Sequence, residues 1–161
     1  MRLYHGSLET VKQPKIITPS RTLDFGAGFY TTTSLKQASE WAQKRLRKPG
    51  EMGYVNVYDI DMRDIPTLKV LHFDKPSDEW VDFVEKNRQD INFVHDYDIV
   101  YGPVANDRVY AQLALYEQGF ISKATLISEL KAYKLIDQLL FHTENALKHL
   151  HFIDSIKIER P

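Results

Sequence analysis

The sequence of 161 residues contains no cysteine, which excludes disulfides, thiolate catalysis and thiolate metal ligands. It also lacks any run of about 18 apolar residues, the length that a membrane-spanning helix needs. The start, Met-Arg-Leu-Tyr-His-Gly-Ser-Leu-Glu-Thr, has no apolar stretch of the kind found in secretory signals. We therefore expect a cytoplasmic protein without a membrane partner.

Charge of one sign is not in excess, because 21 Lys and Arg residues stand against 22 Asp and Glu residues. With a formal net charge of −1, no global positive field would attract nucleic acid or an anionic membrane. Any such partner must be held locally. The apolar share of 43% is ordinary for a folded protein, and the length predicts a single domain over residues 1–161.

The hydrophobic patterns predict strands and helices in irregular alternation. Strands are expected at residues 3–4, 29–32, 54–60, 68–73, 98–101, 136–142 and 152–158, and helices at 77–88, 107–117, 122–133 and 143–149. A capping pattern of Ser34 and Gln37 opens a further helix, which Pro49-Gly50 ends. We expect Gly6-Ser7 to end the first strand and Gly102-Pro103 to break the fifth. Strands scattered among helices of unequal length favour an α+β fold.

Two short segments are the strongest candidates for chemistry. The first, His5-Gly6-Ser7, would also suit a plain strand-to-turn junction in which the histidine caps a carbonyl. The second runs from Asp24 to Thr32 and reads Asp-Phe-Gly-Ala-Gly-Phe-Tyr-Thr-Thr. Its two glycines let the backbone approach a flat ligand, and an aromatic strand follows them. Together the segments resemble the first half of the ADP-ribosyltransferase fold, in its diphtheria-toxin and poly(ADP-ribose) polymerase branch.

The resemblance implies a split β-sheet core with flanking helices and NAD as the co-substrate, without a metal. His5 would hydrogen-bond a ribose hydroxyl of NAD, and the Gly6 backbone would bond the nicotinamide carboxamide. Tyr30 would stack on the nicotinamide ring, and Trp41 would close its other side, unless Trp41 packs in the core. A planar aromatic cation gains roughly 0.5–2 kcal/mol from each such ring contact. The cofactor-binding set also includes Ser7, Gly28 and Phe29.

The strand from Ile136 to His142 resembles the third motif of that family, in which a glutamate offsets positive charge at the ribose C1 carbon. Gln138 stands in the place of that glutamate and is the third catalytic candidate beside His5 and Tyr30. An amide can accept a hydrogen bond from a ribose hydroxyl but cannot take a proton, a loss that typically costs ~10²–10⁴ in rate. The structural alternative is a mid-strand amide that its neighbours satisfy.

The replacement of glutamate leaves three possibilities open. Another carboxylate activates the acceptor, the acceptor is itself a good nucleophile, or the protein binds NAD and scarcely reacts. The carboxylates considered are Asp24, Asp107 and Glu144.

The segment from Asp98 to Asp107, Asp-Ile-Val-Tyr-Gly-Pro-Val-Ala-Asn-Asp, predicts a strand, a turn and a helix capped by Asn106 or Asp107. It is similar to a segment of a bacterial family allied to the ADP-ribosyltransferases. The start of this helix, with Arg108 or Arg21, is a candidate pyrophosphate site, and the segment's role stays open. The histidines at 142, 149 and 151 predict no metal site, because no carboxylate cluster completes a ligand set.

The resemblance implies a bacterial mono-ADP-ribosyltransferase that cleaves NAD and moves ADP-ribose to a protein or nucleic-acid acceptor. A single-domain enzyme of this kind fits the toxin of a toxin-antitoxin or phage-defence pair, with an antitoxin protein as a partner. Two alternatives stay open. One is a catalytically weak NAD- or ADP-ribose-binding interaction module, and the other is an NAD glycohydrolase that uses water as the acceptor.

Overall fold

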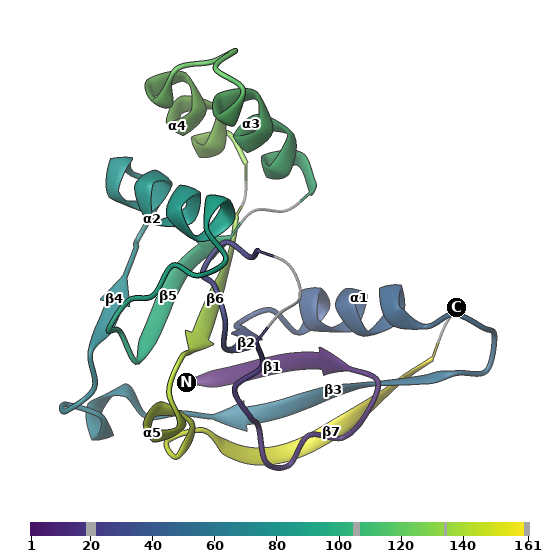
Figure 1. The fold of residues 1–161 in the computed structure, drawn as a ribbon. Helices are drawn as coiled ribbons and strands as arrows, with labels where there is room; N and C mark the ends of the chain where they lie inside the picture. Colours follow the sequence, from purple (N-terminus) through teal and green to yellow (C-terminus); the bar gives the residue numbers. More distant parts are fainter. Residues whose placement is uncertain (19–21, 105–106, 134, 160–161) are drawn as a thin grey trace.

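A computed structural model describes residues 1–18, 22–104, 107–133 and 135–159, without the side chains of residues 64, 107 and 108. The strands are β1 (Arg2–Ser7), β2 (Phe29–Thr32), β3 (Met52–Asp59), β4 (Val70–His72), β5 (Ile99–Val104), β6 (Ile136–Phe141) and β7 (His151–Glu159). The helices are α1 (Leu35–Arg45), α2 (Asp78–Gln89), α3 (Asp107–Glu117), α4 (Lys123–Lys131) and α5 (Glu144–Leu147), with a 3-10 turn η1 (Met62–Asp64) (Figure 1). Within the described residues, no helix is long and apolar enough to cross a membrane.

The strands form one mixed sheet in the order β4-β5-β6-β2-β1-β3-β7. Only β4 and β5 pair in parallel, and every other neighbouring pair is antiparallel. An open mixed sheet with helices of unequal length confirms the expected α+β class.

Strand β2 joins two halves of this sheet. Strand β1 pairs with β3 along its whole length, from Arg2 to Ser7, but its register with β2 consists of the single pair Tyr4 and Thr32. On its other side, β2 pairs with β6 along its whole length. In Figure 1, β4, β5 and β6 run steeply across the direction of β1, β3 and β7. The two halves therefore meet, and begin to part, at the β1–β2 junction.

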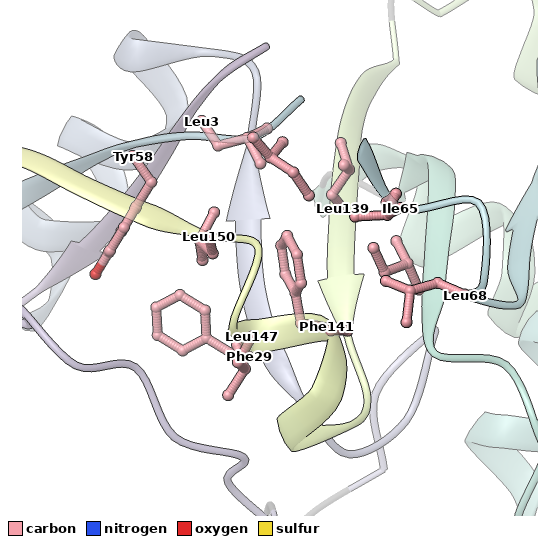
Figure 2. Close-up of a cluster of buried hydrophobic side chains, with 12 residues drawn as sticks. Leu3, Phe29, Tyr58, Ile65, Leu68, Leu139, Phe141, Leu147 and Leu150 are labelled. Atoms are coloured by element: carbon pink, nitrogen blue, oxygen red, sulfur yellow. The ribbon is translucent and has the colours of Figure 1, made fainter. Parts of the chain in front are cut away.

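Each face of the sheet carries its own hydrophobic core. One face presents Leu3, Phe29 and Phe141, which pack with Leu147 of α5 and with Leu68 (Figure 2). Because side chains alternate along a strand, the neighbouring residues face the other side. There the strand residues Val100 and Leu140 pack against α2 and the α3–α4 pair. Both faces are thus covered, and β3 is buried on both sides of its pleat from Val55 to Tyr58.

Helix α1 lies close against β1, on the face opposite Leu3. A Cβ atom built on Gly6 would lie 2.1 Å from the Ala38 carbonyl oxygen, so only glycine permits this approach. The expected N-cap is confirmed, since Ser34 Oγ accepts a hydrogen bond from the Gln37 N–H at 3.2 Å. Leu35, whose helical spacing from Ala38 and Ala42 predicts a place on the same buried face, is instead exposed.

Two expected strand ends are wrong. Strand β1 continues through His5, Gly6 and Ser7, because β3 pairs with each of these residues. Strand β5 continues through Gly102-Pro103 to Val104, because β6 pairs with it throughout. The Pro103 carbonyl accepts a hydrogen bond from the Trp80 indole at 2.8 Å, on the side that β4 no longer covers. The missing N–H of proline therefore costs no ladder bond.

Candidate functional site at the junction of β1 and β2

A histidine side chain replaces a backbone donor where β1 and β2 part. Beyond the pair of Tyr4 and Thr32, the next bond across the junction runs from His5 Nδ1 to the Tyr30 carbonyl oxygen, at 2.7 Å. In a continued antiparallel ladder this carbonyl would accept from the backbone of Gly6. The imidazole therefore holds the two strands together while their backbones separate.

The backbone of Gly6 lies at the point where β1 and β2 part. The Asn56 side-chain amide on β3 donates to the His5 carbonyl at 3.5 Å, which orients this carbonyl towards β3. Because successive residues of a strand direct their amides to opposite sides, the amide of Gly6 faces β2. Arg45, in the last turn of α1, donates from Nη1 to the Gly6 carbonyl at 3.4 Å. One charged side chain thus lies beside the β1–β2 junction.

The environment of His5 fixes its protonation state. Burial, with its ring 4.4 Å from the ring of Phe29, lowers the pKa of His5 to about 4, and the positive charge of Arg45 contributes. The imidazole is therefore neutral at pH 7. A carbonyl can only accept, so the proton sits on Nδ1, and Nε2 keeps a lone pair. His5 is thus built to accept a hydrogen bond from a hydroxyl or an N–H group.

The two glycines of the second segment permit close contacts within the protein itself. Gly26 has a φ of +82°, which favours glycine, and its carbonyl accepts from the Tyr30 hydroxyl at 2.7 Å. A Cβ atom on Gly26 would lie 2.5 Å from Asn87 Oδ1, and one on Gly28 would lie 2.6 Å from the Phe141 carbonyl oxygen. The segment from Gly26 to Tyr30 therefore has a fixed course, and it holds the Tyr30 ring in place.

Two further histidines hold this segment, and sequence reasoning missed both roles. His142 Nδ1 donates to the Ala27 carbonyl at 2.7 Å, and His95 hydrogen-bonds the Phe25 backbone. The imidazole rings of His95 and His142 pack edge to face, with their centroids 4.3 Å apart. Burial and the neighbouring His95 lower the pKa of His142 to about 4, and its buried Nε2 has no partner among the described residues. No signal in the sequence links these histidines to residues more than 60 positions away.

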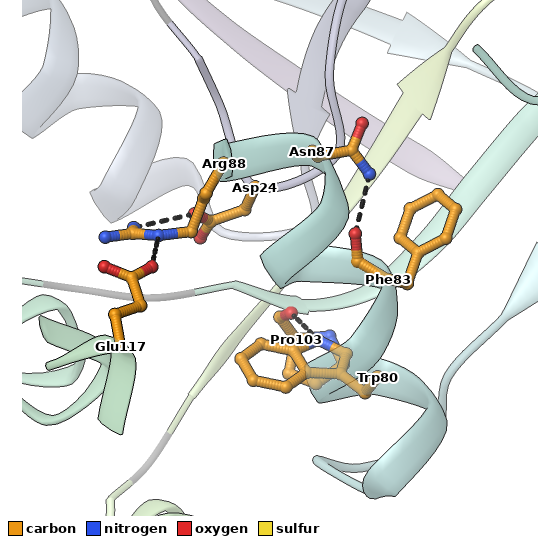
Figure 3. Close-up of polar contacts among 7 residues, drawn as sticks. All are labelled: Asp24, Trp80, Phe83, Asn87, Arg88, Pro103 and Glu117. Carbon is orange, nitrogen blue, oxygen red and sulfur yellow. Dashed lines mark hydrogen bonds and ion pairs between the residues drawn. The ribbon is translucent and has the colours of Figure 1, made fainter. Parts of the chain in front are cut away.

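Asp24 at the start of the segment belongs to a charged network (Figure 3). Its carboxylate is 5% exposed and accepts from Arg88 of α2 at 3.3 Å. Arg88 also donates to Glu117 of α3 at 2.7 Å and lies 4.9 Å from the centre of the Tyr110 ring. Because its charge is already balanced, Asp24 does not fit the expectation of a free carboxylate that activates an acceptor.

Gln138 is buried, with 4% of its surface exposed, between Thr32 of β2 and Gly102 of β5. Alternation along β2 and β6 puts its side chain on the same face of the sheet as Tyr30. In the described part of the chain, no residue hydrogen-bonds the Gln138 side-chain amide. The structural alternative, an amide satisfied by its neighbours, finds no support there. The polar atoms of this amide are not fully enclosed, since His142 Nε2 is the buried side-chain atom without a partner among the described residues, so a polar ligand group could reach Gln138.

Asp137 faces the opposite side of the sheet, as alternation predicts. Its carboxylate accepts a hydrogen bond from the Tyr101 hydroxyl at 3.3 Å. It therefore cannot replace a glutamate at position 138.

Trp41 is half-buried on α1, whereas its helix neighbours Ala38 and Ala42 are fully buried. The interpretation of Trp41 as a core residue is therefore wrong. The rings of Trp41 and Tyr30 do not contact each other in the described structure. His5 and Tyr30 adjoin through their hydrogen bond, but alternation puts their side chains on opposite faces of the sheet. The structure thus brings His5, Gly6 and Tyr30 together at the β1–β2 junction, with Gln138 on the Tyr30 face.

The other residues that the sequence marked as candidates either stabilise the fold, lie away from the site or lie outside the described residues. Ser7 accepts from the Asn56 side-chain amide at 3.1 Å and donates to the Glu9 carbonyl, and Phe29 is a core residue. Glu144 is exposed at the start of α5, beyond the far end of β6 from Gln138. Arg21, Asn106 and the side chains of Asp107 and Arg108 lie outside the described residues.

Asn56 is a residue of the site that sequence reasoning missed. It is fully buried on β3, where its Oδ1 accepts from the Val11 N–H at 2.8 Å and its Nδ2 donates to the Glu9 carbonyl at 3.1 Å. These bonds fix the chain that leaves β1. A lone asparagine within the aromatic and valine pattern of residues 54–60 was the available signal.

The residues of the candidate site fall within the match to one known family. A family model described as a protein of unknown function, DUF3990, matches residues 1–152, nearly the whole chain. The chain belongs to the DUF3990 family. The DUF3990 match includes the His5-Gly6-Ser7 segment, the glycine segment and Gln138. No curated protein matches the chain. Among the described residues, no group of three or more His, Asp or Glu side chains is arranged to hold a metal ion.

Proposed function

We propose that an opening lies between β1 and β2, and that this DUF3990 protein binds NAD there and transfers ADP-ribose to a macromolecular acceptor. The observation that carries the proposal is the bond from His5 to the Tyr30 carbonyl, which links β1 and β2 beyond their single backbone pair of Tyr4 and Thr32. The proposal includes an ADP-ribosyltransferase-like core. Two sheet halves that meet at β2 are consistent with such a core.

Each part of the substrate has a matching group. The nicotinamide ring would stack on Tyr30, with the half-exposed Trp41 as the candidate for its second face, and its carboxamide would bond the Gly6 amide. The neutral His5 would accept a hydrogen bond from a ribose hydroxyl through Nε2. Because His5 and Tyr30 approach the opening from opposite faces of the sheet, NAD would extend through the opening, with nicotinamide on the Tyr30 face.

The transfer step breaks the bond between ribose C1 and the nicotinamide nitrogen, and nicotinamide leaves with the bonding electron pair. An acceptor nucleophile attacks C1, forms the new bond and releases its proton. The Gln138 amide would accept a hydrogen bond from a ribose hydroxyl, which fits its lack of a hydrogen-bond partner among the described residues. It supplies no negative charge and no base. Fast transfer therefore requires an acceptor that is a good nucleophile by itself.

The neutral Gln138 also favours a second candidate function, an NAD- or ADP-ribose-binding module with little turnover. A third, NAD hydrolysis, differs only in that water attacks C1.

One experiment separates these functions. The full chain is incubated with NAD labelled in its adenosine part and with a fractionated cell lysate, and both free nicotinamide and labelled macromolecules are measured. Transfer predicts released nicotinamide together with label on protein or RNA. Release without label indicates hydrolysis, and NAD affinity without release indicates a binding module. A protein with neither NAD affinity nor release contradicts the proposal in all its forms.

Tyr30 variants test the binding site itself. Tyr30→Ala removes the stacking ring, and we expect NAD affinity to fall by roughly 1–3 kcal/mol in calorimetric titration, the scale of a lost ring contact. Tyr30→Phe keeps the ring and removes the hydroxyl that bonds Gly26, so its affinity should stay near that of the wild type. Equal affinities of wild type and a folded Tyr30→Ala variant would remove Tyr30 from the site.

A further inference from the structure

Two buried glutamine side chains, Gln37 and Gln138, adjoin Thr32 on the Tyr30 face of the sheet. Thr32 of β2 and Gln138 of β6 lie directly opposite each other in the antiparallel register, so their side chains project from the same face. Thr32 Oγ1 donates a hydrogen bond to Gln37 Oε1 of α1 at 2.6 Å. We infer that Gln37 is a further substrate-binding residue and, resting on the proposed function, that the two amides together select a free hydroxyl of the nicotinamide ribose.

The side chain of Gln37 is not used by the helix to which it belongs. In a capping box, the glutamine three residues after the N-cap reaches back and accepts from the N-cap N–H. Here the Ser34 N–H instead donates to Thr32 Oγ1 at 3.1 Å, and the Gln37 side chain bonds Thr32. The part of Gln37 in capping is limited to its backbone N–H, which donates to Ser34 Oγ. The start of α1 therefore does not explain an amide at this buried position.

The two amides offer complementary hydrogen-bonding roles. Because Gln37 Oε1 accepts from the Thr32 hydroxyl, Gln37 Nε2 remains as a donor. In the described part of the chain, neither this Nε2 nor the Gln138 amide has a hydrogen-bond partner, and neither is fully enclosed. A polar ligand group could therefore reach both amides.

A hydroxyl group matches this pair, because a hydroxyl donates one hydrogen bond and accepts up to two. It would donate to Gln138 Oε1 and accept from Gln37 Nε2. The carboxamide of nicotinamide offers the same two roles, but the proposed site already gives it the Gly6 amide. A ribose hydroxyl is therefore the group that the two glutamines would hold.

The position of Gln37 connects it with the nicotinamide end of the proposed site. Gln37 precedes Trp41, the candidate for the second face of the ring, by four residues, so the two side chains are neighbours on α1. Thr32 follows Tyr30 by two residues and projects from the same face of β2. A ring held by Tyr30 and Trp41 would therefore leave its ribose beside the two amides.

Calorimetric titration of the full chain with NAD and two deoxy analogues tests this inference. One analogue lacks the 2′-hydroxyl of the nicotinamide ribose, and the other lacks the 3′-hydroxyl. We expect the wild type to bind one of them roughly tenfold more weakly than NAD, because two hydrogen bonds are lost. Gln37→Met keeps the volume but removes one of these bonds, so its preference for NAD over that analogue should fall to roughly threefold.

The matched control is Gln43→Met, the same substitution six residues further along α1 and on a different side of the helix. It should bind NAD and both analogues as the wild type does. In Gln37→Met, Thr32 Oγ1 can still donate to the Asp137 carbonyl at 3.1 Å, so no buried hydroxyl loses its last acceptor. Gln37→Leu removes the amide with a different shape and should give the same reduced preference if the methionine variant does not fold.

The same titrations separate this inference from the proposed function. A folded Gln37 variant that keeps the tenfold preference overturns the role of Gln37 and leaves NAD binding standing. Equal wild-type affinities for NAD and both analogues, or an equally reduced preference in Gln43→Met, overturn it in the same way. A wild type without NAD affinity rejects the proposed function, and the role of Gln37 with it.

Discussion

The imidazole of His5 shows how one side chain can create a site by replacing a backbone group. A continued β1–β2 ladder would close the sheet and satisfy the Gly6 amide with Tyr30. The His5 imidazole extends further than a backbone amide and makes the bond to the Tyr30 carbonyl in its place. The strands therefore stay linked while their backbones part. The same burial that positions the ring keeps it neutral, so its second nitrogen is available as an acceptor.

Gln138 is the residue whose replacement is most informative. We expect Gln138→Glu to increase nicotinamide release from NAD by at least ~10²-fold, because a carboxylate offsets positive charge at C1 and accepts a proton. Burial should raise the pKa of the new carboxyl, so the increase should grow with pH. Release is measured by chromatography after incubation with NAD.

Gln138→Met provides the control, since it keeps the volume but removes the amide. It should lose NAD affinity while its circular dichroism spectrum stays unchanged. A folded Gln138→Glu protein with the wild-type rate would show that position 138 does not face the reacting carbon.

At the scale of elements, three histidines hold the segment from Phe25 to Tyr30. His95, His142 and His5 hydrogen-bond the backbone at Phe25, Ala27 and Tyr30 in turn. Neutral imidazoles serve as donors here, because their charge would be buried among core side chains. The glycine segment is therefore a fixed element, although it contains neither helix nor strand before Phe29.

This arrangement predicts a loss of stability in mild acid. The pKa values of His5 and His142 are lowered from 6.5 to about 4, so between these values the unfolded chain binds protons that the folded chain does not. Stability is therefore full above pH 6.5 and falls as the pH drops towards 4. At pH 5 the loss is at most about 2 kcal/mol for each histidine. Urea unfolding between pH 7.5 and 5 measures it.

His142→Gln separates the titration from the hydrogen bond, since a glutamine amide can still donate to the Ala27 carbonyl but does not titrate. Its unfolding free energy should depend less on pH than that of the wild type. A slope identical to the wild type would exclude His142 as a source of the acid sensitivity.

The sequence was most informative for elements that depend on near neighbours. The N-cap of α1 was predicted because Ser34 and Gln37 lie within one turn and make the bond by themselves. The ends of β1 and β5 were not predicted, because distant strands decide them. Pairing with β3 carries β1 through Gly6, and pairing with β6 carries β5 through Pro103.

In the candidate site, too, the local motifs could be predicted from the sequence and the long-range contacts could not. The His5-Gly6-Ser7 and glycine segments were visible as motifs, but their roles in the structure differ from residue to residue. Ser7 and Phe29 stabilise the fold, because Ser7 hydrogen-bonds Asn56 on β3 and Phe29 packs in the hydrophobic core. Arg45, Asn56 and His142 act across long sequence separations, and no local pattern in the sequence reports such contacts.

At the scale of the whole molecule, Arg88 connects the glycine segment with the helices beyond α2. It binds Asp24 in the segment and Glu117 on α3, and its side chain is only 17% exposed. Removing one member of a buried charge pair is costly, because the other charge stays buried without its partner.

We therefore expect Arg88→Met to lower the free energy of unfolding by about 3 kcal/mol, since the buried Asp24 carboxylate loses the Arg88 guanidinium. Glu117→Gln removes the more exposed partner and keeps an acceptor, so it should cost only about 1 kcal/mol. Urea unfolding at pH 7.5 measures both. Equal costs for the two variants would contradict the assignment of Asp24 as the critical buried charge.

The central claim is that NAD occupies the opening between β1 and β2. Amide hydrogen exchange, followed by mass spectrometry with and without saturating NAD, tests it most directly. The account predicts slower exchange in peptides that cover residues 4–8 and 26–32, and unchanged exchange in β7 and α4. Unchanged exchange in both of these peptides, or protection confined to other parts of the chain, would contradict it.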